Sequence, residues 1–218
     1  MADTSAPLSA VSICNFAVDT LDEQAITSLD DNTKFARFCV RQYGYTRDEL
    51  LRMYPWCFAE EYQQLAPDAT APPFTWTYSY TMPNGWLRLL PLTECGRPNG
   101  RSLKFKKVGQ KIYTNYGPTL NVRGIKSITD ETQFDVLYAR ALGQFLAYRA
   151  SQLITGKAGY VPKTQQMFQD AMQAAMQADS LERGTPETVE NDYGTQDVLA
   201  ARGLGCDDSY GYVPLIAY

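Results

Sequence analysis

Histidine is absent from this 218-residue sequence. The imidazole is the side chain whose ordinary pKa lies near neutral pH, so its absence excludes Ser-His-Asp catalysis, Cys-His catalysis and the His-bearing zinc sites. Five cysteines are present, but none of them forms the Cys-x-x-Cys pair that a cysteine zinc site requires. We therefore expect no catalytic residue, no metal and no cofactor.

Long apolar runs are also lacking. No run approaches the ~20 residues that span a bilayer. The N-terminus, Met1–Pro7, has no basic stretch followed by an apolar core, as a secretory signal would. Apolar residues make up 44% and charged residues 20% of the chain, as in an ordinary soluble globular protein. We expect a protein made in the cytoplasm, with reduced cysteines and no membrane contact.

Hydrophobic spacing divides the chain into helical and β-rich parts. A three-to-four-residue period predicts helices over residues 8–22, 28–54, 130–154 and 162–181, the second with Asp30 or Asp31 as its N-cap. A period of two, broken by Gly and Pro turns, predicts strands over residues 75–80, 86–92, 103–108, 111–115 and 120–125.

The order of these elements predicts an α+β fold. The expected architecture is a four-helix bundle with a β-rich insertion between helices 2 and 3, plus an extended C-terminal arm. The corresponding parts are the N-terminal helical pair of residues 1–65, the β-rich tip of residues 66–128, the C-terminal helical pair of residues 129–184 and the arm of residues 185–218.

Positive charge is concentrated in the β-rich part. Between Gly96 and Ile128 there are eight bases and no acid, although the whole chain has a formal charge of −4. Such a block could protect an exposed strand edge, contact an acidic protein partner, or attract the phosphates of a nucleic acid, with Tyr113 and Tyr116 near enough to stack on bases. The eight bases are Arg97, Arg101, Lys104, Lys106, Lys107, Lys111, Arg123 and Lys126.

The last 34 residues have the opposite character. Between Thr185 and Tyr218 there are six acids and one base. One interpretation is a disordered terminus. The apolar ending from Tyr210 to Tyr218 favours instead a segment that becomes buried on a partner, because disordered tails are poor in large apolar residues. The residues expected to dock are Tyr193, Val198, Leu199, Tyr210, Tyr212, Val213, Leu215, Ile216 and Tyr218.

The run Asp48–Ala59 reads DELLRMYPWCFA and leads, after a Pro-rich gap, into a Trp-rich β region. Together with Ser28–Asp31 about twenty residues earlier, this run resembles the tail tubular A family, the head-to-tail adaptors of short-tailed bacteriophages. The resemblance spans about residues 8–180 and includes the helix containing Asn15, the strand Trp76–Pro83 and the helix Phe134–Leu153.

The resemblance implies a structural virion protein without catalysis. Members of this family are helical bundles with a β-rich tip, and they form a dodecameric ring below the portal that continues the DNA channel. The implied partners are the portal protein, a tail tube or nozzle protein, further copies of the chain and passing genomic DNA, read without sequence specificity. The C-terminal arm would dock on the portal, and the basic tip would face the tail or the channel. The alternative is a nucleic-acid-binding module that uses residues 96–128.

Overall fold

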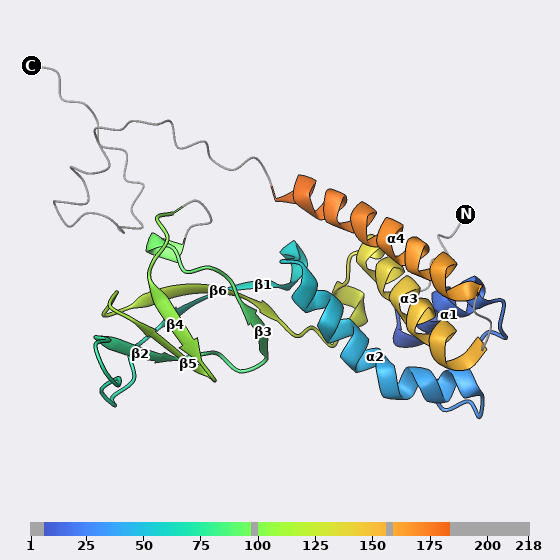
Figure 1. The fold of residues 1–218 in the computed structure, drawn as a ribbon, viewed down its shortest axis with the longest axis horizontal. Helices are drawn as coiled ribbons and strands as arrows, with labels where there is room; N and C mark the ends of the chain where they lie inside the picture. The colour runs from blue at the N-terminus through green and yellow to red at the C-terminus, as the bar shows by residue number, and fades with distance from the viewer. Residues whose placement is uncertain (1–6, 97–99, 156–158, 184–218) are drawn as a thin grey trace, which may run out of the picture.

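The computed structural model describes residues 7–96, 100–155 and 159–183. This part of the chain holds four α-helices and two small antiparallel three-stranded sheets, which confirms the mixed α+β class. Figure 1 shows the helices gathered at one end of the molecule and the strands at the other, joined where α2 ends. None of the described helices is both long enough and apolar enough to cross a membrane.

The helices begin at polar caps, as their sequence predicts. Helix α1 (Ala10–Leu21) starts with a capping box between Ser9 and Ser12. Helix α2 (Lys34–Met53) is capped by Thr33, so the expectation of Asp30 or Asp31 as its N-cap is wrong. The carboxylate of Asp31 instead accepts hydrogen bonds from the backbone of Thr27 and Ser28, which closes the turn before the helix.

Helix α3 (Val136–Ala150) starts later and ends earlier than the predicted residues 130–154, whereas α4 (Tyr160–Glu182) lies within two residues of the predicted 162–181 at each end. At the predicted start, Asp130 caps a short 3-10 turn, Glu131–Gln133, instead. Helix α3 is capped by Asp135, whose carboxylate accepts from two amides. A π-helical turn, Ser151–Thr155, follows α3. Helix α4 then runs back along α3. The chain therefore returns close to the end of α2.

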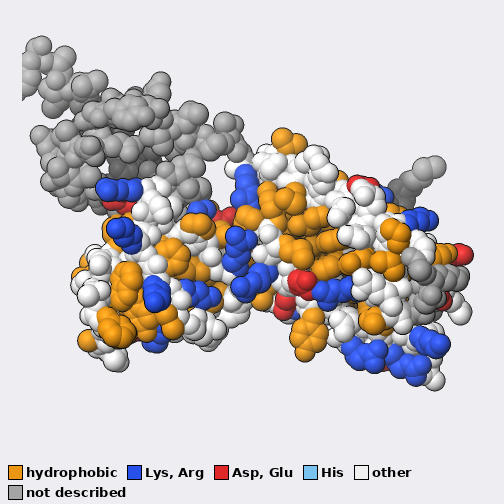
Figure 2. Space-filling model, in the orientation of Figure 1, with side chains coloured by type: hydrophobic (Ala, Val, Ile, Leu, Met, Phe, Trp, Pro, Cys, Tyr) orange, Lys and Arg blue, Asp and Glu red, His pale blue; other side chains and the backbone are white. Residues whose placement is uncertain are grey.

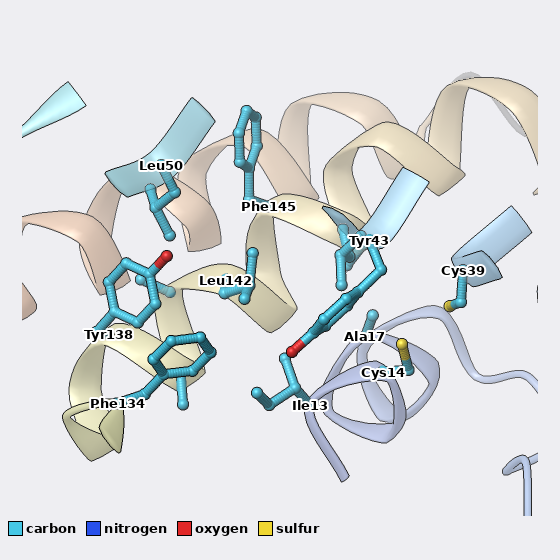
Figure 3. Packing of buried hydrophobic residues seen from close by; sticks show 14 of the residues in the cluster. Ile13, Cys14, Ala17, Cys39, Tyr43, Leu50, Phe134, Tyr138, Leu142 and Phe145 are labelled. Atoms are coloured by element: carbon cyan, nitrogen blue, oxygen red, sulfur yellow. The ribbon is translucent and has the colours of Figure 1, made fainter. Parts of the chain in front are cut away.

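Helix α3 lies at the centre of the helical part, because it packs against α1, α2 and α4. In Figure 3 the side chains of Tyr138 and Leu142 from α3 lie among Ile13 of α1 and Leu50 of α2. The crossing of α1 and α3 is close at Gly143, where an added Cβ would lie 2.7 Å from the Cβ of Phe16. Glycine is required there for packing rather than for backbone conformation.

Each sheet is antiparallel and has three strands. The first has the order β1-β6-β3 and the second the order β2-β5-β4. Their bounds are β1 Glu60–Leu65, β2 Tyr78–Thr81, β3 Trp86–Leu89, β4 Phe105–Val108, β5 Lys111–Thr114 and β6 Leu120–Lys126. A second hydrophobic core between the sheets contains Leu65, Tyr80, Met82, Trp86, Leu92, Ile112, Leu120 and Val122.

Strand β1 is the element that the sequence analysis missed. Its sequence, EEYQQL, has no apolar alternation, and it was included in the N-terminal helical pair of residues 1–65. It pairs along its whole length with β6, from Glu60 opposite Ile125 to Leu65 opposite Leu120. The neighbouring strand therefore decides its conformation, and the β region begins before Pro67.

The helical part and the β region are joined at the end of α2. The hydroxyl of Ser127 donates to Asp48 at 2.9 Å, and the guanidinium of Arg52 donates to the carbonyl of Leu87 at 2.7 Å. After the helix, the buried indole of Trp56 donates to the carbonyl of Leu50 and packs edge-on against Tyr138, with ring centroids 5.1 Å apart. These contacts fix the β region against the helices.

Candidate interaction surface

The basic block of residues 96–128 divides into bases with and without a carboxylate partner. The most buried is Arg123, on the central strand β6. Its guanidinium lies 3.0 Å from the carboxylate of Glu60 on β1, and each side chain is only 10% exposed. A charge this deeply buried contributes to the fold and offers little to a partner. The expectation that Arg123 forms part of an exposed basic contact surface is therefore wrong.

Two further bases of the block are paired at its surface. The ammonium of Lys111 lies 2.8 Å from the carboxylate of Asp68, and that of Lys126 lies 3.5 Å from Glu61. Asp68 also accepts from the hydroxyls of Ser79 and Thr81, at 2.6 and 2.7 Å. Although burial by itself would raise the pKa of Asp68, these hydrogen bonds and the nearby ammonium hold that pKa below its ordinary value.

The remaining described bases of the block are exposed: Arg101, Lys104, Lys106 and Lys107. None of them forms an ion pair with another residue that the structure describes. Figure 2 shows Lys and Arg side chains prominent over the β region, with few acidic side chains beside them. Arg97 lies outside the described residues. These four bases form the basic edge, the part of the block free to meet a partner.

Two of the four bases, Lys106 and Lys107, lie on strand β4, an outer strand of its sheet, and the other two lie in the segment that leads into it. All four residues of β4 are exposed, including the apolar Phe105 and Val108. The two-residue turn Gly109-Gln110 connects β4 to β5, and Gly109 has φ +59°, a left-handed conformation that glycine adopts without strain. Lys106 stands directly opposite Tyr113. One of the two tyrosines proposed for stacking thus lies beside a free lysine.

A second set of bases lies on α2, away from the β region. Lys34, Arg37 and Arg41 are exposed and recur at three and four residues, so they share one helix face. They form no ion pair with any described carboxylate. The order of charges along the sequence does not reveal this cluster, because acids before and after the three bases balance their charge.

A hollow on the described surface lies where β1, β6 and the turn before α3 meet. It has a volume of about 340 Å³ and is lined in part by Glu60, Glu61, Lys126 and Asp130. Each of these charged groups already has a partner within the structure. Glu60 pairs with Arg123, and Glu61 pairs with Lys126 and accepts from the indole of Trp86. Asp130 caps the 3-10 turn. Among the described residues no cluster of His, Cys, Asp and Glu could hold a metal ion.

The end of α4 is held at the junction by a buried carboxylate. Asp179, 6% exposed, accepts from the backbone amide of Cys57 at 2.7 Å and from the guanidinium of Arg183 at 3.0 Å. Burial and then the contact with Asp179 raise the pKa of the Cys57 thiol to about 11, so this cysteine is a poor nucleophile. The cluster fixes the last turn of α4 against the segment that follows α2.

The docking residues expected on that arm, from Tyr193 to Tyr218, lie outside the described residues. Sequence reasoning missed the acids that decide which bases stay free. Glu60, Glu61 and Asp68 all lie more than forty residues before the bases with which they pair, and only the pairing of β1 with β6 and of β2 with β5 brings them together.

No family model matches this sequence, and no curated protein matches it. The chemistry of the surface and the arrangement of its parts therefore have to support any functional conclusion.

Proposed function

We propose that this protein is a structural adaptor that joins the head of a short-tailed bacteriophage to its tail. One observation carries the proposal. The run Asp48–Ala59, on which the resemblance to the tail tubular A family rests, lies where the helical part, the β region and the end of α4 meet. A protein that transmits contacts between two partners needs its binding parts fixed to one another, and this run supplies the fixed joint.

In this proposal α1–α4 act as the four-helix bundle of a ring subunit. A ring subunit has to bury its flanks against neighbouring copies, and the helical part offers half-buried apolar side chains for this. Figure 2 shows such side chains gathered over α3 and α4. They include Tyr148, Phe168, Met172 and Met176. The ring would be a dodecamer in the virion, with genomic DNA passing through its channel.

The arm and the tip of the subunit would meet different partners. The arm of residues 185–218 departs from the anchored end of α4 and would dock on the portal protein through its apolar ending. The basic edge on β4 would face the tail tube or nozzle protein, or the channel. The unlike charges of the two parts, acidic in the arm and basic in the tip, support this assignment because they favour unlike partners.

The arm assignment is tested by truncation. Both hydrophobic cores consist of residues between Ile13 and Ala175, so a chain ending at Gly184 should keep its fold. We expect removal of residues 185–218 to abolish binding to the cognate portal ring while the circular dichroism spectrum and melting temperature stay close to those of the full chain. Normal portal attachment by the folded, truncated chain would contradict the assignment.

A second candidate function is non-specific nucleic-acid binding. The observation that favours it is the basic edge, with its four exposed bases that have no carboxylate partner among the described residues. Binding through phosphates releases counterions, so affinity for duplex DNA should fall steeply with salt. The triple variant Lys104→Glu, Lys106→Glu and Lys107→Glu should abolish this binding.

The matched control is Lys34→Glu, Arg37→Glu and Arg41→Glu, which changes the net charge equally on α2. Equal loss of DNA affinity in both triple variants would show a general charge effect instead of a site on β4. Absence of DNA binding by the full chain at low salt would remove this candidate.

A further inference from the structure

Strand β4 lies at the edge of its sheet in the part of the chain that the structure describes. It pairs with β5 on one side, and no described strand pairs with it on the other. In an edge strand every second residue directs its backbone N–H and C=O groups away from its partner, where they can bind another segment. Lysines discourage pairing with a second basic edge, but they favour an acidic segment.

The other bases of the same block show how the chain neutralises this region. Arg123, Lys111 and Lys126 each take a carboxylate from a segment outside the block. Within the described residues, no carboxylate forms an ion pair with Arg101, Lys104, Lys106 or Lys107, although the backbone of Glu94 donates to the carbonyl of Arg101. An excess of acid that follows the described residues in the chain is found in residues 187–208, which hold six acids and one base.

We propose that residues 187–208 dock along the basic edge on β4 of their own chain when the protein is free. The proposal rests on charge complementarity and on the open edge, and it stands whether or not the protein is a phage adaptor. The occupant is the acidic stretch; the apolar ending from Tyr210 to Tyr218 stays available to another partner.

The length of the chain permits this docking. Asp179 and Arg183 fix the end of α4 at the junction, beside the β region. From Arg183 to Asp208 an extended chain reaches up to about 85 Å, well beyond the width of a domain of this size. A tethered segment also has a local concentration in the millimolar range, so its own chain competes favourably with other copies.

A regulated surface follows from this arrangement. The acidic stretch would shield the basic edge until a partner captures the apolar ending and draws the arm away. In the adaptor proposal, portal binding by the apolar ending would then uncover the tail-facing edge, which orders the two assembly steps. This consequence depends on the adaptor proposal, but the docking itself does not.

Zero-length cross-linking of the full chain tests the docking. A water-soluble carbodiimide first activates a carboxylate as an O-acylisourea. The neutral amine of a lysine in contact with it then attacks the activated carbonyl, and an amide forms as the substituted urea is released. Only groups in contact are joined. The ion pairs Lys111–Asp68 and Lys126–Glu61, at 2.8 and 3.5 Å, provide internal positive controls. A mixture of ¹⁴N-labelled and ¹⁵N-labelled protein separates links within one chain from links between chains.

We expect amides between Lys104, Lys106 or Lys107 and the acids of residues 187–208, with both peptides carrying the same label. If the control amides Lys111–Asp68 and Lys126–Glu61 form but no amide joins these lysines to residues 187–208, the proposal is overturned. Links joining differently labelled peptides would overturn it too, because the edge would then be covered by another copy.

Hydrogen exchange gives a second, independent readout. Removing residues 185–218 should speed amide exchange over residues 104–107 by about fivefold or more, because the cover is lost. The amides of β6, which has a strand on each side, should exchange at the same rate in both proteins and serve as the control. Unchanged exchange at β4 would contradict the docking even if the truncated chain no longer bound a portal, so the two proposals fail separately.

Discussion

The helical part and the β region of this protein are held together by different forces. The helical part has one large core in which aromatic rings meet edge to face, as Tyr138 does with Trp56, Phe58 and Phe134. The β region has a smaller core, and its three ion pairs join its basic strands to acids from β1 and the following segment. The helical part has three ion pairs too, but only the one between Arg149 and Glu49 joins two helices, because the others link neighbours within one helix or its end. Charge changes and pH should therefore affect the β region more, and lost apolar area should affect the helices more.

The largest loss of stability is expected in the helical part. Trp56 is 1% exposed and contacts the rings of Tyr54 and Tyr138. Trp56→Ala should lower the free energy of unfolding by about 4 kcal/mol, through lost apolar burial and the cavity left behind. Phe74→Ala, at a side chain that is 96% exposed, is the control and should change it by less than about 0.5 kcal/mol. Equal effects in urea titrations would contradict the assignment of the core.

The next effect probes charge in the β region. Glu60→Gln leaves the buried guanidinium of Arg123 without its counter-charge and should cost about 3 kcal/mol of unfolding free energy. Adding Arg123→Met should recover much of this loss, because the unpaired charge is removed. Lys126→Met, in a pair that is half exposed, should cost less than about 1 kcal/mol. A Glu60→Gln variant as stable as Lys126→Met would show that the pair on β6 contributes little.

A smaller effect tests close packing in the β region. An added Cβ at Gly124 would lie 2.0 Å from the ring of Trp86, so Gly124→Ala must displace the indole and should cost about 2 kcal/mol. The same substitution at Gly44, within α2, meets nothing within 4 Å and should stabilise the protein by about 0.5 kcal/mol or more. In thermal unfolding, we expect a lower melting temperature for Gly124→Ala and a higher one for Gly44→Ala. Melting temperatures that shift in the same direction would count against the structure.

The smallest effect is the pH dependence at Asp68. Its folded pKa lies below its ordinary value of 3.8, so the contact with Lys111 stabilises the fold above that value and is lost as pH falls through the lower, folded pKa. Asp68→Asn should therefore be less stable than the natural chain at pH 7, by about 1 kcal/mol or less. The gap should close below pH 4. A gap that stays constant in acid would contradict this role for the carboxylate.

Local patterns in the sequence predicted much of the fold. The three-to-four-residue period located all four described helices, and the turn Gly109-Gln110 located the hairpin of β4 and β5. The start of α2 was wrong, because Asp31 and Thr33 are both good caps and only the turn at Thr27 and Ser28 decides between them.

Contacts distant in sequence could not be predicted in this way. Strand β1 is polar, and β6, about sixty residues later, determines its conformation. The same pairing brings Glu60 to Arg123, 63 residues away in the chain, and so removes one base from the expected contact surface. The sequence identifies all eight bases of the block. It does not show which of them pair with a carboxylate and which stay unpaired among the described residues.

The central claim is that the protein is a ring-forming adaptor, and it is tested most directly by its size and shape in solution with and without the cognate portal ring. Light scattering and negative-stain microscopy would give both. We expect small subunits alone and a ring seated on the portal when it is present. A chain whose size and shape are unchanged by the portal would contradict the adaptor proposal and would leave nucleic-acid binding at the basic edge as the stronger candidate.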